Sequence, residues 1–195
     1  MFEHLTKAYI QREAPSSVIP HCMTVTAVKK KYGFDAVYKL ASNENPFGVS
    51  PKAAKAIEES IKTCHLYSDN SHEDILYGKL SALHDVTPSQ IFIAGGAASV
   101  LSQIADVFLQ EGTECIIPSP AYPPYYFWAY RNCAAIVDVP CNQENQTLDT
   151  EAVLAAVTPR TRLIFLCNPN NPTSTAISRD SLVSLISRLP RDVIA

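Results

Sequence analysis

The sequence lacks any excess of positive charge. Its 195 residues carry 16 Lys and Arg against 19 Asp and Glu, which gives a formal net charge of -3. Proteins that bind polyanions normally concentrate basic residues on one surface. The composition therefore gives no electrostatic reason to expect nucleic acid or a membrane as a partner.

Long apolar runs and paired cysteines are lacking too. The opening residues, MFEHLTKAYIQREAP, mix charged with apolar side chains, so they hold neither a signal-peptide core nor a membrane span. The six cysteines include no CxxC pair, and no histidine cluster has metal-ligand spacing. These absences exclude a disulfide scaffold and predict a cytoplasmic protein in a reducing setting, without a metal site.

What is present is the composition of an ordinary globular protein, with 47% hydrophobic and 18% charged residues. Residues 1–36 contain one amphipathic stretch, Val25 to Tyr32, which predicts an N-terminal arm with a short helix. Residues 37–195 are expected to form part of one large domain, which this chain leaves incomplete. Its first elements are predicted as a strand over 37–41, then helices over 51–63 and 72–84.

From residue 90 onward, strand-like runs alternate with helical patterns. The expected strands are 90–94, 114–117, 135–139 and 162–167, and residues 192–195 resemble the start of another. Apolar strands separated by helices are typical of a mostly parallel sheet covered on both faces. The predicted fold class is therefore α/β, a three-layer αβα arrangement. Such sheets bind ligands beyond the carboxyl ends of their strands.

Three loops at those strand ends contain unusual residues. Gly95 and Gly96 precede a helix, whose free amides and dipole could bind a phosphate, although a tight turn without a ligand is equally compatible. Their spacing does not match GxGxxG or a Walker loop, which disfavours a dinucleotide or nucleoside triphosphate. Tyr122 stands in a proline-rich loop, where its ring could stack on a flat cofactor.

The third loop, Asn168-Pro169-Asn170-Asn171-Pro172-Thr173, places asparagine amides at the end of a buried strand. Asparagines usually cap turns, but two Asn-Pro steps in so short a segment favour a ligand-binding role.

Five motifs in order give the sequence a family resemblance. These are LASNENPFG at 40–48, LYSD at 66–69, GGAA at 95–98, PAY at 120–122 and NPNNPT at 168–173. Together they resemble the N-terminal half of a class I/II (fold-type-I) aminotransferase dependent on pyridoxal phosphate, closest to the histidinol-phosphate branch. The resemblance implies part of the large domain of that fold.

The resemblance also implies roles for individual residues. The backbone amides of Gly96, Ala97 and Ala98 would hold the cofactor phosphate. Tyr122 would stack on the pyridine ring, and Asn171 would donate a hydrogen bond to the ring's phenolic oxygen. The resemblance further implies a homodimer in which Tyr67 reaches the cofactor of the partner subunit. It also implies that the entrance for a small amino-acid-like substrate is lined by Asn43, Glu44 and Asn45.

Two positions depart from the family pattern. Ala97 and Ala98 stand where an acidic residue or a hydroxyl is usual, so phosphate binding would rest on backbone amides. Ser174 stands where glycine is usual, which matters if that position needs a positive φ. No catalytic residue is expected in this chain, because the lysine that forms the Schiff base is implied to lie beyond Ala195. We therefore expect the 195-residue chain to be inactive by itself.

Other functions stay open at this point. The residues that read the substrate come mostly later in the family, so a decarboxylase of a phosphorylated amino acid or an aromatic aminotransferase fits the same motifs. A non-catalytic fragment or pseudo-enzyme module is an alternative of another class. A nucleotide-binding α/β module is a third, and it predicts no spectral change with pyridoxal phosphate.

Overall fold

A computed structural model describes residues 23–195, which fall into two compact units. One unit holds the described residues up to Ile93, and the other begins at Ala94 and continues to Ala195. The predicted division between an arm ending at residue 36 and one large domain stays a prediction. Residues 1–22 of that arm lie outside the described part.

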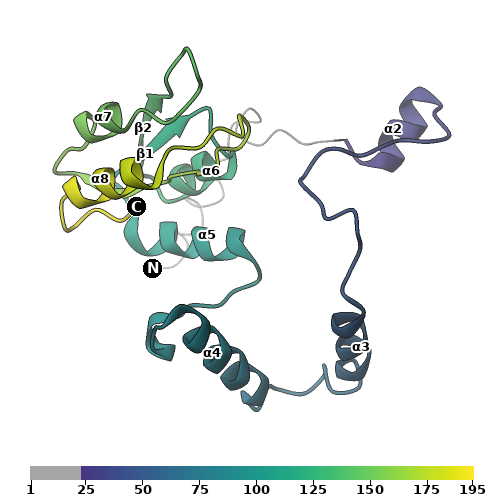
Figure 1. The fold of residues 1–195 in the computed structure, drawn as a ribbon. Helices are drawn as coiled ribbons and strands as arrows, with labels where there is room; N and C mark the ends of the chain where they lie inside the picture. The colour runs from purple at the N-terminus through teal and green to yellow at the C-terminus, as the bar shows by residue number, and fades with distance from the viewer. Residues whose placement is uncertain (1–22) are drawn as a thin grey trace, which may run out of the picture. The chain divides into compact units, whose positions relative to one another are not determined.

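The first unit consists of helices and loops (Figure 1). Its elements are α2 (Val25–Tyr32), α3 (Pro51–Ser60), α4 (Ser71–His84) and a short 3-10 helix, η1 (Pro88–Gln90). Helix α2 has the predicted bounds because both of its ends are capped. The hydroxyl of Thr24 accepts a hydrogen bond from the Ala27 amide, and Gly33 ends the helix with a φ of 71°.

Two predicted strands are absent from this unit and its boundary. Residues 37–41 and 90–94 contain no strand, and within the described part of the chain neither segment is paired with a strand of the sheet. The backbone of Ile91 is extended, with φ −110° and ψ 133°, so local geometry is compatible with a strand. A strand is completed only by a pairing partner, and the local sequence pattern cannot supply one.

The second unit contains the sheet. In chain order its elements are α5 (Ala97–Phe108), β1 (Glu114–Ser119), α6 (Pro124–Arg131), β2 (Ala135–Pro140), α7 (Thr150–Ala155), β3 (Thr161–Ile164) and α8 (Arg179–Arg188). The strands are parallel in the order β2-β1-β3. Beyond β3, Ile194 forms a parallel bridge to Leu163, where the sequence predicted the start of a strand.

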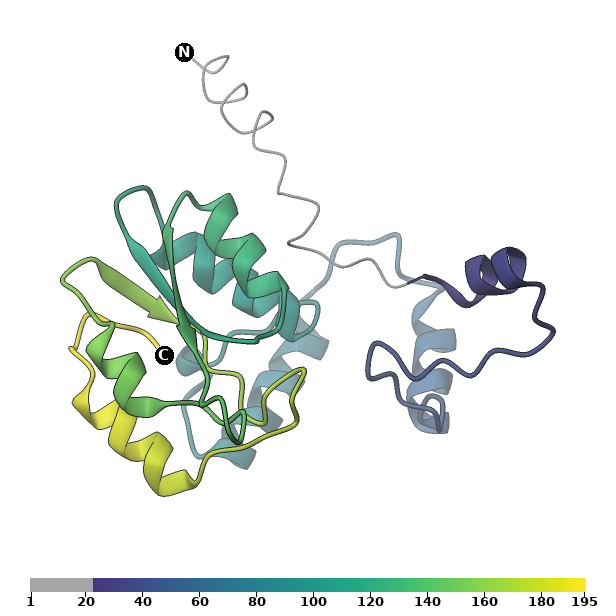
Figure 2. The ribbon, with the colours of Figure 1, turned by 90° about the horizontal axis from the view of Figure 1, so that it is seen from above.

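Side chains that alternate along the strands build one core on each face of the sheet. Cys115 and Ile117 pack in a cluster with residues of α5 and α6. Ile116 and Ile164 pack in a second cluster that includes Leu185 of α8. Each fully buried aliphatic side chain contributes about 1.5–3 kcal/mol. Figures 1 and 2 show helices on both faces, which confirms the predicted three-layer αβα arrangement.

A buried carboxylate ties together the amino ends of β1 and β3. Glu114 is 4% exposed and accepts hydrogen bonds from the Thr158 hydroxyl at 2.5 Å and from Arg160 Nε at 2.9 Å. The Thr158 hydroxyl and then the Arg160 guanidinium hold the pKa of Glu114 below its usual range. Because this network lies at the start of β1, its role is to fix the sheet.

Candidate functional site

The opposite, carboxyl ends of the strands carry the loops with the candidate residues. The loop after β1 contains Tyr122, the loop after β3 includes the residues from Asn168 to Ser178, and the loop after β2 contains Gln146. These loops follow three adjacent parallel strands, so they meet at one edge of the sheet.

Tyr122 lies against a group of aromatic rings. Its ring makes edge contacts with Tyr125 at 5.4 Å between centroids and with Trp128 at 6.3 Å. Tyr125 is stacked on Phe165 at 4.4 Å, and burial raises the pKa of its hydroxyl. Tyr122 is half-buried. Its contacts through ring edges fix the orientation of the side chain while part of the ring stays accessible.

The loop after β3 is held by hydrogen bonds within itself. The side-chain oxygen of Asn168 accepts from the Ile177 amide at 3.1 Å. The Ser174 amide donates to the Asn170 carbonyl at 2.7 Å, and Ser174 has a φ of 60°. The position where glycine was expected therefore does adopt the left-handed conformation, which a serine reaches at a cost of about 1–2 kcal/mol.

The side chain of Asn171 makes no hydrogen bond within the described structure. Its backbone amide donates to the thiol sulfur of Cys167 at 3.3 Å. Its side-chain amide forms no hydrogen bond with any residue of 23–195, although the residue is half-buried. Its side-chain amide is not fully buried, so it is accessible to solvent or to a ligand.

The start of α5 offers further unused donors. Gly96 caps the helix with a φ of 91°, which glycine adopts readily. Its amide is not free, because it donates to the Ala94 carbonyl at 2.7 Å. The amides of Ala97 and Ala98 lack an acceptor among the described residues, and both residues are exposed. An anion at this helix end would therefore be bound by Ala97 and Ala98 rather than by all three predicted amides.

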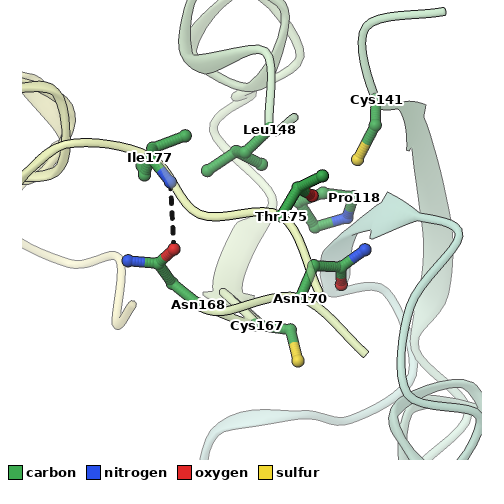
Figure 3. A pocket seen from close by; sticks show the side chains of 8 residues that line it. All are labelled: Pro118, Cys141, Leu148, Cys167, Asn168, Asn170, Thr175 and Ile177. Atoms are coloured by element: carbon green, nitrogen blue, oxygen red, sulfur yellow. Dashed lines mark hydrogen bonds between the residues drawn. The ribbon is translucent and has the colours of Figure 1, made fainter. Parts of the chain in front are cut away.

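A small cavity lies beside the loop after β3 (Figure 3). It offers about 10 Å³ to the centre of a water molecule, the lower limit for holding one water. Pro118, Cys167, Asn170 and Thr175 are among its lining residues. It is too small for a cofactor ring, so it belongs to the support of these loops.

The other predicted site residues lie in the first unit. Asn45 is occupied by its own turn, since its side chain accepts from the Phe47 amide at 3.0 Å and donates to the Gly48 carbonyl at 3.0 Å. Glu44 pairs with Lys39, and Asn43 has a φ of 51°. Tyr67 is fully exposed. Within the first unit, the positions of these residues neither form a binding site nor exclude one.

The residue types found near the strand ends limit which ligands could bind there. Residues 94–195 contain no lysine. Among residues 23–195, no group of three or more His, Cys, Asp or Glu is arranged to hold a metal ion. None of the helices in this part of the chain is long and apolar enough to cross a membrane. The strand ends thus offer amides, hydroxyls and an aromatic ring, together with the carboxylate of Asp138.

Two residues of this edge were not singled out from the sequence. Asn170 donates from its side chain to the Pro120 carbonyl at 2.9 Å, across 50 positions of sequence. Asp138 of β2 accepts from Ser119 Oγ at 2.7 Å and from Tyr126 OH at 2.8 Å. Both contacts join segments far apart in the chain, so no local pattern indicates them.

Comparisons with known proteins agree with this geometry. A family model described as aminotransferase class I and II matches residues 35–194. A histidinol-phosphate aminotransferase of Brevibacillus brevis is 35% identical over 86% of this chain and 45% of its own length. One of Moorella thermoacetica is 35% identical over 94% of this chain and 47% of its own length. The chain thus spans about half the length of these curated relatives.

Solved structures show the same similarity. A histidinol-phosphate aminotransferase of Sinorhizobium meliloti, solved in complex with pyridoxal-5'-phosphate, has a TM-score of 0.78 and 24% identity, over 94% of this chain and 50% of that one. A putative histidinol-phosphate aminotransferase of Erwinia carotovora has a TM-score of 0.72 and 27% identity, over 78% of this chain and 44% of that one. The first of these likenesses shows the fold alone.

Proposed function

Because the chain belongs to the aminotransferase class I and II family, we propose that it binds pyridoxal 5'-phosphate and forms part of a transaminase. The proposed reaction transfers an amino group from histidinol phosphate to a 2-oxo acid. The observation that carries the choice of substrate is the identity of 35% to histidinol-phosphate aminotransferases over most of this chain.

The second unit supplies three kinds of contact that fit the cofactor. The free amides of Ala97 and Ala98, at the positive end of the α5 dipole, suit its phosphate group. The ring of Tyr122 suits a stacked pyridine ring. The unpaired amide of Asn171 suits the phenolic oxygen of that ring, because its NH₂ group can donate there.

Each of these residues binds or orients, and none of them carries a proton to the substrate. When bound, pyridoxal phosphate supplies the carbonyl carbon that takes up the amino group and a ring that accepts electrons from the substrate α-carbon. Tyr122 keeps the ring in one plane and shields one of its faces from water. The hydrogen bond from Asn171 favours the charged form of the phenolic oxygen.

The reactive lysine is proposed to come from outside these 195 residues. Residues 94–195 contain no lysine, so the unit that holds the sheet has no side-chain amine of its own to offer at the strand ends. A homodimer in which Tyr67 reaches the partner's cofactor, an entrance lined by residues 43–45, and a cytoplasmic location belong to the same proposal.

Titration and turnover test the proposal separately. Pyridoxamine 5'-phosphate, which needs no lysine, should bind the protein and quench the fluorescence of Trp128, its only tryptophan. Histidinol phosphate with 2-oxoglutarate should give glutamate in the full-length protein. Failure to bind pyridoxamine phosphate would contradict the cofactor assignment. Release of CO₂ from a phosphorylated amino acid, without glutamate, would show that the parent is a decarboxylase.

A further inference from the structure

Asn170 connects the two loops that carry the proposed ring contacts. Its side-chain nitrogen lies 2.9 Å from the Pro120 carbonyl oxygen and 2.9 Å from the Thr173 hydroxyl oxygen. Pro120 is two positions before Tyr122, and Asn170 is directly followed by Asn171. One side chain therefore spans from the segment with the stacking ring to the segment with the free amide.

The hydrogen atoms of this contact can be assigned without ambiguity. The Pro120 carbonyl can only accept, so the atom facing it must be the NH₂ group of Asn170. Thr175 donates its hydroxyl proton to the Gln146 carbonyl at 2.7 Å. The 2.7 Å contact between the hydroxyls of Thr173 and Thr175 is then donated by Thr173. Thr173 therefore accepts the second proton of the Asn170 amide.

The result is one directed chain of hydrogen bonds across the loops after β1, β3 and β2. Both amide protons of Asn170 are used, and every hydroxyl in the chain donates once. The backbone of Asn170 is fixed as well, because its amide donates to the Thr175 carbonyl at 2.7 Å and its carbonyl accepts from the Ser174 amide at 2.7 Å. A side chain held at its base and at both protons has little rotational freedom left to lose.

We propose that Asn170 is a positioning residue that sets the spacing between Tyr122 and Asn171 for a flat ring, an inference that rests on the proposed function. Asn170 itself has no free donor for the ligand. Its effect on binding passes through the Pro120 carbonyl on one side and its peptide bond to Asn171 on the other. The spacing matters only for ligands with a ring, and the phosphate contacts at Ala97 and Ala98 do not depend on it.

The test compares Asn170→Asp with Asn145→Asp in the full-length protein. An aspartate at 170 has nearly the same shape but cannot donate to Pro120, and its charge would repel that carbonyl. Asn145 is a matched control because its side chain accepts, from the Thr147 amide at 3.0 Å and the Thr147 hydroxyl at 2.6 Å. A carboxylate at 145 keeps both of those bonds.

Isothermal titration with pyridoxamine 5'-phosphate and with inorganic phosphate separates ring from phosphate binding. We expect Asn170→Asp to weaken pyridoxamine phosphate binding roughly tenfold, since a hydrogen bond is replaced by a repulsive contact. Phosphate affinity should stay within about twofold, and Asn145→Asp should leave both affinities unchanged. Asn170→His, which keeps one N–H donor, should recover part of the loss.

Two results would overturn the positioning role: wild-type pyridoxamine phosphate affinity in Asn170→Asp, or an equal loss of both affinities, which would indicate a general disturbance of the fold. If the unmutated protein binds neither compound, the proposed function fails instead. The two failures are thus distinguished by the unmutated protein alone.

Discussion

The two ends of the sheet are stabilised by different chemistry. At the amino end, Glu114 is a buried charge with a hydroxyl and a guanidinium bound to it. At the carboxyl end, the loops are joined by neutral groups, the amide of Asn170 and the hydroxyls of Thr173 and Thr175. The Asp138 carboxylate at this end accepts from Ser119 Oγ and Tyr126 OH, and the positive end of the α5 dipole favours an anionic ligand.

The amino end can be disrupted by Glu114→Gln, which should have the largest effect on stability. The new amide nitrogen would face the donor of Thr158 or of Arg160, leaving a buried donor unpaired. We expect the free energy of unfolding to fall by about 2 kcal/mol, measured by urea denaturation with Trp128 fluorescence. Ligand binding at the opposite end should be unaffected below the unfolding transition.

Glu151→Gln is the matched control for that variant. Glu151 also pairs with an arginine, Arg188, but both side chains are at least half exposed. Solvent screens such a pair, so its loss should leave the denaturation curve unchanged. Equal losses in the two variants would mean that the burial of Glu114 has no special role.

The proposed ligand contacts at the carboxyl end can be tested by Tyr122→Leu. This variant should change ligand affinity and leave stability unchanged. Leucine fills apolar space beside Tyr125 and Trp128 but offers no flat ring to stack. Pyridoxamine 5'-phosphate should bind roughly tenfold more weakly, equivalent to about 1.4 kcal/mol, while inorganic phosphate binding is retained. Unchanged affinity in the titration would remove Tyr122 from the proposed site.

Low pH should destabilise the amino end of the sheet through Glu114. The pKa of Glu114 is lowered in the folded protein, so below the usual carboxyl range the unfolded chain binds a proton that the folded one does not. The contribution of Glu114 is therefore complete above that range and is lost as the pH falls through the folded pKa. We expect stability to decrease by about 1 kcal/mol per pH unit there, and to decrease less steeply in Glu114→Gln.

The smallest effect is expected from Ser174→Gly, at the carboxyl end. The φ of 60° is strained for serine and not for glycine, so this variant should be stabilised by about 0.5–1 kcal/mol. Ser174→Ala keeps the strain and should show no gain in the same urea experiment. A gain in both variants would assign the effect to the lost hydroxyl instead of the backbone.

Elements with local causes were predictable from the sequence. Helix α2 has caps at both ends, and the apolar runs over 114–117 and 135–139 located β1 and β2 to within two residues. The strands expected over 37–41 and 90–94 were wrong because pairing depends on a partner elsewhere in the chain. β3 ends at Ile164, short of the predicted 167.

The candidate site divides in the same way. Tyr122 and Asn171 follow strand ends that periodicity locates, so their neighbourhood was predictable. The positive φ at Ser174 meets the condition under which the loss of the usual glycine was expected to matter. The role of Asn170 was not predictable from the sequence, because its side-chain amide donates to an acceptor 50 positions away. A hydrogen bond of that kind is set by the packing of three strands and leaves no spacing in the sequence to detect.

Because residues 94–195 contain no lysine, chemical labelling can locate the reactive amine without labelling side chains of this unit. Reducing an imine with borohydride fixes pyridoxal phosphate to whichever amine holds it, and no peptide of this unit can carry that mark on a side chain. Trypsin would cut the same unit only after its arginines. A phosphopyridoxyl group found by mass spectrometry would therefore report the position of the reactive amine without interference from the sheet that binds the ring.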